Sequence, residues 1–232
     1  MDGSIIVGDR KLVAYDQRVR TWHDSGLTFD LKHAPRRQQD PRLIVLHWTA
    51  SERPDNAGAA RLHESLRARG LSVEFAITND GTIHQFVDPV IQRGRHCSRL
   101  NPYSIGVEVS GLGWAAKPGR VPRGDTTKRD VYTDRVHGWR TEFYDYLPSQ
   151  HNAVRELCEL LWIAYPALPR AVCLEPFERW STETLLARGG VCGHLHGAWL
   201  TKKHPKCDPG TAPLRRLAEH VEATRDHVPP VR

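Results

Sequence analysis

The sequence predicts a mixed α/β fold in which helices flank one central sheet. Three observations carry this prediction. Apolar segments of strand length alternate with segments of helical periodicity, a strong turn signal joins two β-rich segments, and 232 residues suffice to bury one sizeable core. We expect a main domain over residues 41–228, with an insertion at about 114–147, preceded by a short β-rich extension over residues 1–40.

The first strand of the main domain is predicted at residues 42–48, RLIVLHW. This short apolar run has β-branched members and lies between Pro41 and the polar segment TASERPDN, as is typical of a buried strand. A helix should follow, with Asp55 or Asn56 as its cap and Gly70 at its end. Its apolar positions fall on one helical face: Ala59, Leu62 and Leu66.

Residues 72–77 and 82–87, SVEFAI and TIHQFV, predict a β-hairpin. The Asp80–Gly81 pair between them is a strong turn signal, because both residues tolerate positive φ. The next strand is predicted at residues 104–109, SIGVEV, and the glycines of the following SGLG end it.

From Trp114 to Leu147 the chain becomes rich in charged residues with Pro-Gly punctuation, which indicates a long surface insertion. A helix is then predicted after Ser149, and another near Pro213, a residue suited to a first helical turn. Both show apolar stripes: Ala153, Leu157, Leu160, Leu161 and Ala164 in the first, and Leu214, Leu217 and Val221 in the second.

The overall charge favours anionic partners. Lysine and arginine number 33 against 27 acidic residues, giving a net charge of +6 and a pI of about 9.2. The charge is spread along the chain, so solubility alone also explains it. No Lys/Arg block interleaved with aromatic residues occurs, and we therefore expect no nucleic-acid partner. The five cysteines include no CxxC pair, which argues against a disulfide framework and a zinc ribbon.

The sequence also gives expectations about location. It has no run of 18 or more apolar residues, so we expect no membrane-spanning segment. The first residues are polar and charged where a signal peptide needs an apolar stretch, which indicates synthesis in the cytoplasm. Action elsewhere would require release or delivery. The sequence does not fix the oligomeric state, and we expect a monomer.

Two residues on predicted strands are candidates for chemistry. His47 ends the first strand, where a lone histidine is more often a hydrogen-bonded core or rim residue than a ligand. Glu108 lies within an apolar strand, where burying an unpaired carboxylate is costly. A general base at the floor of a site would justify that cost, because burial raises its pKa. A glutamate that alternates outward on a half-exposed strand is the simpler interpretation.

The segment CGHLHGAWLTKKHPKCDPG holds further candidates. His194 and Asp208 lie 14 residues apart in it, and the Pro-Gly pair after Asp208 predicts a turn. Two histidines and one carboxylate, with a fourth position left for water, make up a catalytic zinc site. Lys206 could then stabilise the oxyanion that forms when a carbonyl is attacked. Spacing alone does not select this set, because the chain has no HExxH motif.

Five segments in order carry a resemblance to a known family: LIVLHWTAS, SVEFAITNDGTIHQFVDP, SIGVEVSG, CGHLHG and KCDPG. Together they resemble the zinc-dependent N-acetylmuramoyl-L-alanine amidases of type 2, which share their fold with peptidoglycan recognition proteins and some phage lysozymes. The resemblance covers Pro41 to Gly210 and implies that fold. It also implies Zn²⁺ as cofactor and peptidoglycan or a muropeptide as substrate, cut between N-acetylmuramic acid and L-alanine. A non-catalytic peptidoglycan-binding module of the same fold is the alternative.

The resemblance also implies residue roles. His47, His194 and Asp208 match the three zinc ligands. Glu108 matches the carboxylate that activates the metal-bound water, and Lys206 the lysine two residues before the third ligand. His96 lies where relatives have a WHAG-like segment that lines the cleft, and with Trp48 and Trp114 it is a candidate for substrate binding. Support of the site, or a structural place at its rim, is the alternative for His96.

Several features depart from the family pattern. The span from His194 to Asp208 is longer than expected, and His196 and His204 are rivals for the second ligand. Some relatives have a cysteine as third ligand, which leaves Cys207 as an alternative to Asp208. Many relatives carry His or Tyr in the hairpin where this chain has Val73-Glu74, so Glu108 gains importance if the protein is active.

Overall fold

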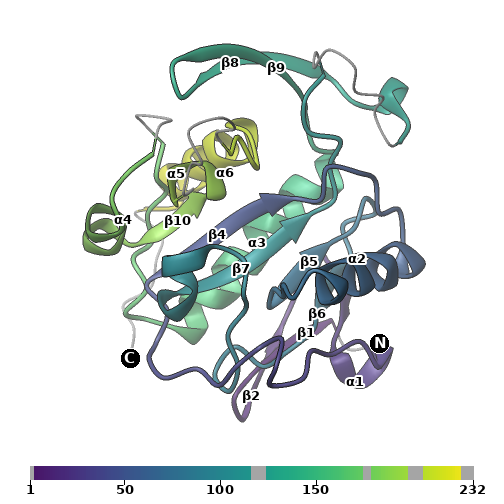
Figure 1. The fold of residues 1–232 in the computed structure, drawn as a ribbon, viewed down its shortest axis with the longest axis vertical. Coiled ribbons are helices and arrows are strands. Elements are labelled where there is room, and N and C mark those ends of the chain that lie inside the picture. Colours follow the sequence, from purple (N-terminus) through teal and green to yellow (C-terminus); the bar gives the residue numbers. More distant parts are fainter. Residues whose placement is uncertain (1–2, 116–123, 175–178, 198–205, 226–232) are drawn as a thin grey trace.

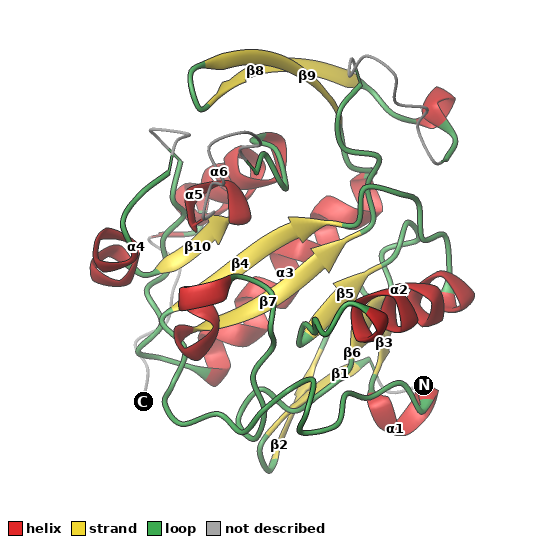
Figure 2. Cartoon of the chain, viewed as in Figure 1, coloured by secondary structure: helices red, strands yellow, loops and turns green. Residues whose placement is uncertain are grey.

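The structure is a computed structural model that describes residues 3–115, 124–174, 179–197 and 206–225. Within these ranges the main feature is a six-stranded mixed sheet of order β10-β4-β7-β5-β6-β3 (Figures 1 and 2). Its strands are β3 (Val19–Arg20), β4 (Leu43–Trp48), β5 (Phe75–Ile77), β6 (Ile83–Gln85), β7 (Ser104–Val109) and β10 (Gly190–Gly193). The predicted α/β fold with a central mixed sheet is confirmed.

The remaining elements are two small hairpins, helices and two 3₁₀ turns. The hairpins are β1 (Ser4–Val7) with β2 (Arg10–Val13), and β8 (Val131–Val136) with β9 (Trp139–Tyr144). The helices are α1 (Trp22–Ser25), α2 (Asn56–Ala68), α3 (Pro148–Ala164), α4 (Thr182–Arg188), α5 (His194–Gly197) and α6 (Ala212–Ala223). The 3₁₀ turns are η1 (Ser98–Tyr103) and η2 (Thr126–Lys128).

The centre of the sheet consists of three parallel strands, with β4 between β10 and β7. All six residues of β4 are buried, which is the pattern of a strand covered on both faces. One face packs on α3 and α6 and takes Ile44, Leu46 and Trp48 from β4. The other face takes Leu43 and Val45 into a smaller cluster with η1 and α4. The apolar core therefore lies on both sides of β4.

The alternation along β4 and β7 decides where their polar residues point. Ile105, Val107 and Val109 of β7 belong to the core under α3. Glu108 therefore points to the opposite face, and so does His47 of β4. The two residues pair directly in the register between the strands. The sheet itself thus brings together two of the residues singled out from the sequence.

The predicted helix after the first strand is confirmed as α2. Asp55 is its cap, with Oδ1 accepting a hydrogen bond of 2.9 Å from the Gly58 N–H, and Gly70 follows its end at φ +67°. The predicted hairpin forms as β5 and β6, but only Gly81 takes positive φ. Asp80 instead accepts hydrogen bonds from the Thr82 N–H and hydroxyl, which stabilise the turn through its side chain.

The first forty residues pack against the main sheet. β3 extends the sheet by pairing with β6, and Ile5 of β1 is fully buried in the large core. The Gln85 side chain exchanges two hydrogen bonds with the backbone of Ile6, at 2.8 and 2.6 Å. The extension therefore shares the core of residues 41–228, and we propose that it folds together with them.

The predicted surface insertion contains regular secondary structure, the hairpin of β8 and β9. Where it is described, its β8–β9 hairpin arches over the end of the sheet next to α5 and α6 (Figure 1). Its inner face is apolar in part, because Val136 and Phe143 are almost completely buried. At its base the buried Arg129 donates to the Asp145 carbonyl at 3.0 Å and to Gln150 Oε1 of α3 at 3.2 Å. The hairpin is thus fixed to the core.

A buried ion pair joins four segments beside the sheet. Arg37 donates to Glu74 Oε1 at 2.7 Å, and both side chains are almost completely buried. The Glu74 carboxylate also accepts the N–H groups of Gly94 and Gly106, each at 2.8 Å. Glu74, which takes the place of the auxiliary residue of the hairpin, is thus a structural residue in this chain.

We expect Arg37→Leu to lower the free energy of unfolding by about 3 to 5 kcal/mol, because it leaves the Glu74 carboxylate buried and uncompensated. Adding Glu74→Gln should recover part of the loss, since the amide carries no charge. Arg18→Leu is the matched control: Arg18 pairs with Asp80 but is 68% exposed, so its loss should cost less than about 1 kcal/mol. Urea denaturation measures all three, and equal losses for Arg37→Leu and Arg18→Leu would contradict the prediction.

Candidate metal centre

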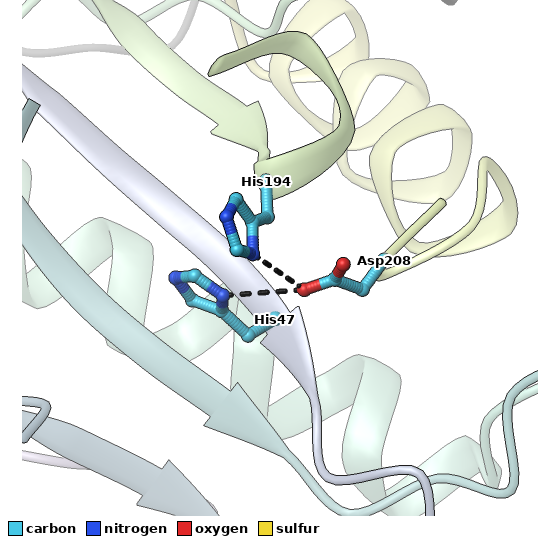
Figure 3. A group of neighbouring side chains, drawn as sticks. All are labelled: His47, His194 and Asp208. Carbon is cyan, nitrogen blue, oxygen red and sulfur yellow. Dashed lines mark hydrogen bonds and ion pairs between the residues drawn. The ribbon is translucent and has the colours of Figure 1, made fainter. Parts of the chain in front are cut away.

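Three side chains converge where the carboxyl ends of neighbouring parallel strands meet. His47 lies near the end of β4, and His194 begins α5 directly after β10, the strand paired with β4. Asp208 comes from the segment before α6 (Figure 3). Their ligand atoms all lie within 4.8 Å of one another. Sheets of this kind bind ligands at the carboxyl ends of their strands, so the position is typical of a functional site.

Both histidines present the same ring nitrogen to one carboxylate oxygen. The distance from Asp208 Oδ2 to His47 Nδ1 is 3.2 Å and to His194 Nδ1 is 2.9 Å. Ligands about 2.1 Å from a tetrahedral zinc ion lie roughly 3.4 Å apart, so these separations are close to those of a coordinating set. All three side chains are largely buried, at 4%, 14% and 8% exposure for His47, His194 and Asp208.

Burial and mutual charge set the protonation of this group in the protein without metal. Burial lowers the pKa of His47 to about 4, so this ring is neutral. Burial would also lower the pKa of His194, but the charge and hydrogen bond of Asp208 outweigh it and raise that pKa to about 10. Burial would raise the pKa of Asp208, yet the two histidines, His194 above all, hold it far below its usual range. Asp208 and His194 therefore form an ion pair.

Glu108 lies on β7 directly opposite His47 and lines the same cleft. Its Oε2 atom is buried and accepts no hydrogen bond. Burial raises the pKa of this carboxyl to about 8, and the negative charge of Asp208 adds to the rise. The simpler interpretation, a glutamate pointing into solvent from a half-exposed strand, is wrong for this chain.

The cleft around these residues has a volume of about 470 Å³, within the range of small-molecule sites. Lys206 is exposed and contributes to its lining two residues before Asp208. Trp48 and Trp114 also line it, with their ring centroids 5.1 Å apart. Trp48 is only 9% exposed and packs mainly in the core, whereas Trp114 is half-buried and presents more of its surface.

His96 contacts Nε2 of His47, the ring nitrogen that does not face Asp208. The two rings meet edge to face, with His47 Nε2 3.0 Å from His96 Nδ1, and His96 Nε2 lies 3.3 Å from the Ser104 hydroxyl. Metal-binding histidines use such contacts to fix their tautomer and orientation. Both ring nitrogens of His96 thus have a hydrogen-bonding partner within the protein. We propose a supporting role for it in place of the expected contact with substrate.

The sequence reasoning missed Gly106, which makes room for His96. A Cβ atom at this position would lie 2.6 Å from two carbon atoms of the His96 ring, closer than real contacts allow. A glycine inside an apolar strand often marks such a close approach, so the signal was present in the sequence.

The rival ligands do not join the group within the part of the chain that the structure describes. His196 is buried, with Nδ1 accepting the Gly193 N–H at 3.1 Å and Nε2 donating to the Leu174 carbonyl at 3.4 Å. Cys207 packs against the apolar core, and the converging set contains Asp208 in its place. His204 lies outside the described residues.

The donor set fits zinc. Two imidazole nitrogens and one carboxylate oxygen are ligands that zinc prefers in catalytic sites, where a fourth position stays open. The buried Asp208 carboxylate and the restrained tautomer of His47 match the protonation that ligation needs.

One comparison with known proteins identifies a family. A sequence model of a protein family, described as N-acetylmuramoyl-L-alanine amidase, matches residues 37–211. A search of curated proteins finds no match.

Among the helices that the structure describes, none has the length and apolar character needed to cross a membrane.

Several solved structures are similar to this chain. Wild-type PGRP-LB of Drosophila is 14% identical, covers 93% of this chain and 99% of its own, and has a TM-score of 0.50. The Ph2119 endolysin of Thermus scotoductus MAT2119 bacteriophage Ph2119 is 15% identical, with coverages of 87% and 99% and a TM-score of 0.49. AmpDH3 of Pseudomonas aeruginosa, in complex with anhydromuramic pentapeptide, is 22% identical. The match covers 82% of this chain and 69% of its own, with a TM-score of 0.47. At these identities the likeness concerns the fold.

We expect zinc binding at neutral pH to release protons, because a metal ligand must be unprotonated and His194, with a pKa of about 10, carries a proton. His47 and Asp208 are already unprotonated, so the three ligands should release about one proton in total. Isothermal titration calorimetry in buffers of different ionisation enthalpy measures the number. The Glu108→Gln variant removes any contribution from the neighbouring carboxyl. Binding heats that do not depend on the buffer would contradict the prediction.

Proposed function

The chain belongs to the N-acetylmuramoyl-L-alanine amidase family, Amidase_2, and from this premise we propose that it is a zinc-dependent peptidoglycan amidase. Its reaction would be hydrolysis of the amide bond between N-acetylmuramic acid and L-alanine, in the cell wall or in soluble muropeptides. The observation that carries the proposal is the convergence of His47, His194 and Asp208 in one cleft beside Glu108, whose Oε2 atom is buried.

In this proposal His47, His194 and Asp208 hold the zinc ion through two Nδ1 atoms and one carboxylate oxygen. Zinc bound in this way lowers the pKa of a bound water molecule to about 7 and polarises a carbonyl group. His96 keeps the His47 ring in the orientation that directs Nδ1 to the metal, by holding Nε2 at 3.0 Å.

Glu108 is the proposed general base. Burial raises its pKa to about 8 in the protein without metal. A zinc ion nearby would lower this pKa toward neutral pH, the range in which a general base can take a proton in one step and return it in the next. Its buried Oε2 atom has no partner in the protein, so it is free to accept that proton. Without such a role, an unpaired carboxylate oxygen on a central strand would lower the stability of the fold with no compensating benefit.

Lys206 is the proposed oxyanion stabiliser. Its exposed ammonium group lies at the cleft that Glu108 and the three ligands share. When water attacks the amide carbonyl, negative charge develops on the carbonyl oxygen, and a nearby cation stabilises that charge more than it stabilises the uncharged amide. Trp114, half-buried at the same cleft, offers an aromatic surface for a sugar ring.

The test is mass spectrometry of the soluble products after the zinc-loaded protein is incubated with purified peptidoglycan and, separately, with soluble muropeptides. Stem peptides that begin with L-alanine are the expected product. Activity on the intact wall alone would favour a protein that reaches the wall by release or delivery, and activity on muropeptides alone would favour a cytoplasmic role. Binding without peptide release from either substrate would replace the proposal by a recognition module of the same family.

We expect Glu108→Gln and Lys206→Ala each to lower kcat by about 10²- to 10³-fold while zinc content stays at one ion per chain. Asp208→Ala should instead lose the metal and the activity together, because it removes a ligand. Glu142→Gln is the matched control for the first variant, since Glu142 lies exposed on β9. Steady-state kinetics with metal analysis checks these outcomes, and full activity of Glu108→Gln would exclude the assigned base.

A further inference from the structure

The inner face of the β8–β9 hairpin contacts the segment that carries Lys206 and Asp208. Side chains that alternate along β8 point to this face, as the period of a strand requires. Tyr132, Asp134 and Val136 are these residues, and Tyr132 and Asp134 bond to the chain just after Asp208. No residue of β8 or β9 is among those that line the cleft. An effect of Tyr132 or Asp134 on the reaction would therefore pass through the segment that these residues contact.

Tyr132 fixes the start of α6. Its hydroxyl oxygen accepts hydrogen bonds from the backbone N–H groups of Thr211, at 3.2 Å, and Ala212, at 3.3 Å. These are N–H groups at a helix start, which have no partner inside the helix. The Thr211 hydroxyl does not cap the helix, because it donates to Asp134 Oδ2. Tyr132 thus supplies the cap from another part of the chain.

Gly210 permits this approach. A Cβ atom there would overlap the Tyr132 hydroxyl, and the φ angle of Gly210 is +82°, a conformation that other residues rarely adopt. Tyr146, which follows the hairpin, donates from its hydroxyl to the Pro209 carbonyl at 3.2 Å. The insertion therefore contacts two residues of the Asp208–Gly210 turn, Pro209 and Gly210.

His137 contacts the backbone of Lys206 from the tip of the hairpin. His137 and Gly138 form its two-residue turn with φ angles of +54° and +79°, as in a type I′ turn. The first of these positions normally takes asparagine, aspartate or glycine, and a histidine there is strained. His137 Nε2 donates to the Lys206 carbonyl at 2.8 Å, so this residue gains a contact that offsets the strain.

We propose that the β8–β9 hairpin is a positioning element of the metal centre, in which Tyr132 orients the Asp208 ligand and His137 orients Lys206. The contacts fall on Lys206, Pro209, Thr211 and Ala212, on both sides of the ligand. The role of Lys206 rests on the proposed amidase function, whereas the effect on metal binding does not. Tyr132 and His137 are not among the residues that line the cleft, and in this proposal they act through the segment that carries Lys206 and Asp208.

The first experiment measures metal affinity and needs no enzymatic activity. Tyr132→Phe removes the hydroxyl that holds the residues after Asp208, and we expect the zinc dissociation constant, determined by competition with a chromophoric chelator, to rise about tenfold. Tyr144→Phe is the matched control on the same hairpin, because Tyr144 lies on the outer face and should leave the constant unchanged. The Co²⁺-substituted proteins report the ligand geometry through their visible absorption bands, which should change only in Tyr132→Phe.

Equal zinc affinities and equal Co²⁺ spectra for Tyr132→Phe and wild type would overturn this part of the proposal. If Tyr132→Phe does not fold, as judged by circular dichroism, Asp134→Asn weakens the adjacent contact with Thr211 and serves as the second variant. It should raise the dissociation constant in the same direction. A wild-type protein that binds no zinc would overturn the hairpin proposal and the proposed function together.

The second experiment concerns Lys206. His137→Gly removes the donor without adding backbone strain, and we expect kcat for stem-peptide release to fall about tenfold with KM and zinc affinity unchanged. His137→Gln restores an N–H donor and should recover much of the rate, a rescue that a merely structural role would not produce. Equal kcat for His137→Gly and wild type would overturn the role of His137. If wild type releases no peptide but Tyr132→Phe still weakens zinc binding, only the proposed function fails.

Discussion

The whole site depends on one carboxylate oxygen. Asp208 Oδ2 lies within hydrogen-bond distance of two imidazole rings, one on β4 and one directly after the adjacent parallel strand β10, and burial from water strengthens both interactions. Such a group is stable only if its backbone cannot move, since a buried charge without its partners is costly. The surrounding structure meets this requirement on every side. The sheet fixes His47 and His194, His96 restrains the His47 ring, and the insertion holds the turn that carries Asp208.

Much of the fold could be predicted because local signals agreed with the tertiary structure. β4 and β7 are apolar runs bounded by polar residues, and α2 combines a capping aspartate, a single apolar stripe and a terminal glycine. β10 was not predicted because its four residues, GVCG, carry two glycines and no periodicity. The β8–β9 hairpin alternates as strands do, but its His-Gly turn lacks the usual Asn-Gly or Asp-Gly signal, so the segment was interpreted as a surface excursion.

The same contrast applies to the site. His47, Glu108, His194, Lys206 and Asp208 could be named from the order of their motifs, and the structure gathers all five at one cleft. The residues of the insertion that contact the Lys206–Asp208 segment could not be named. Tyr132 and His137 act through contacts between segments about 70 to 80 residues apart, and no local pattern encodes such contacts. Glu74 lies in one of the motif segments, but its partner Arg37 and the four segments that the pair joins beside the sheet could not be read from that motif.

The long separation between the ligands has a further consequence. His47 and Asp208 are 161 residues apart, and four of the six strands of the described sheet, β5, β6, β7 and β10, lie between them. An ion that bridges them acts as a cross-link, because it closes a loop whose entropy the unfolded chain would otherwise keep. It also binds only the folded state, so its affinity adds to the stability of the entire domain. A chain still emerging from the ribosome lacks the third ligand until residue 208 has been made. Formation of the metal site is therefore coupled to folding of the domain.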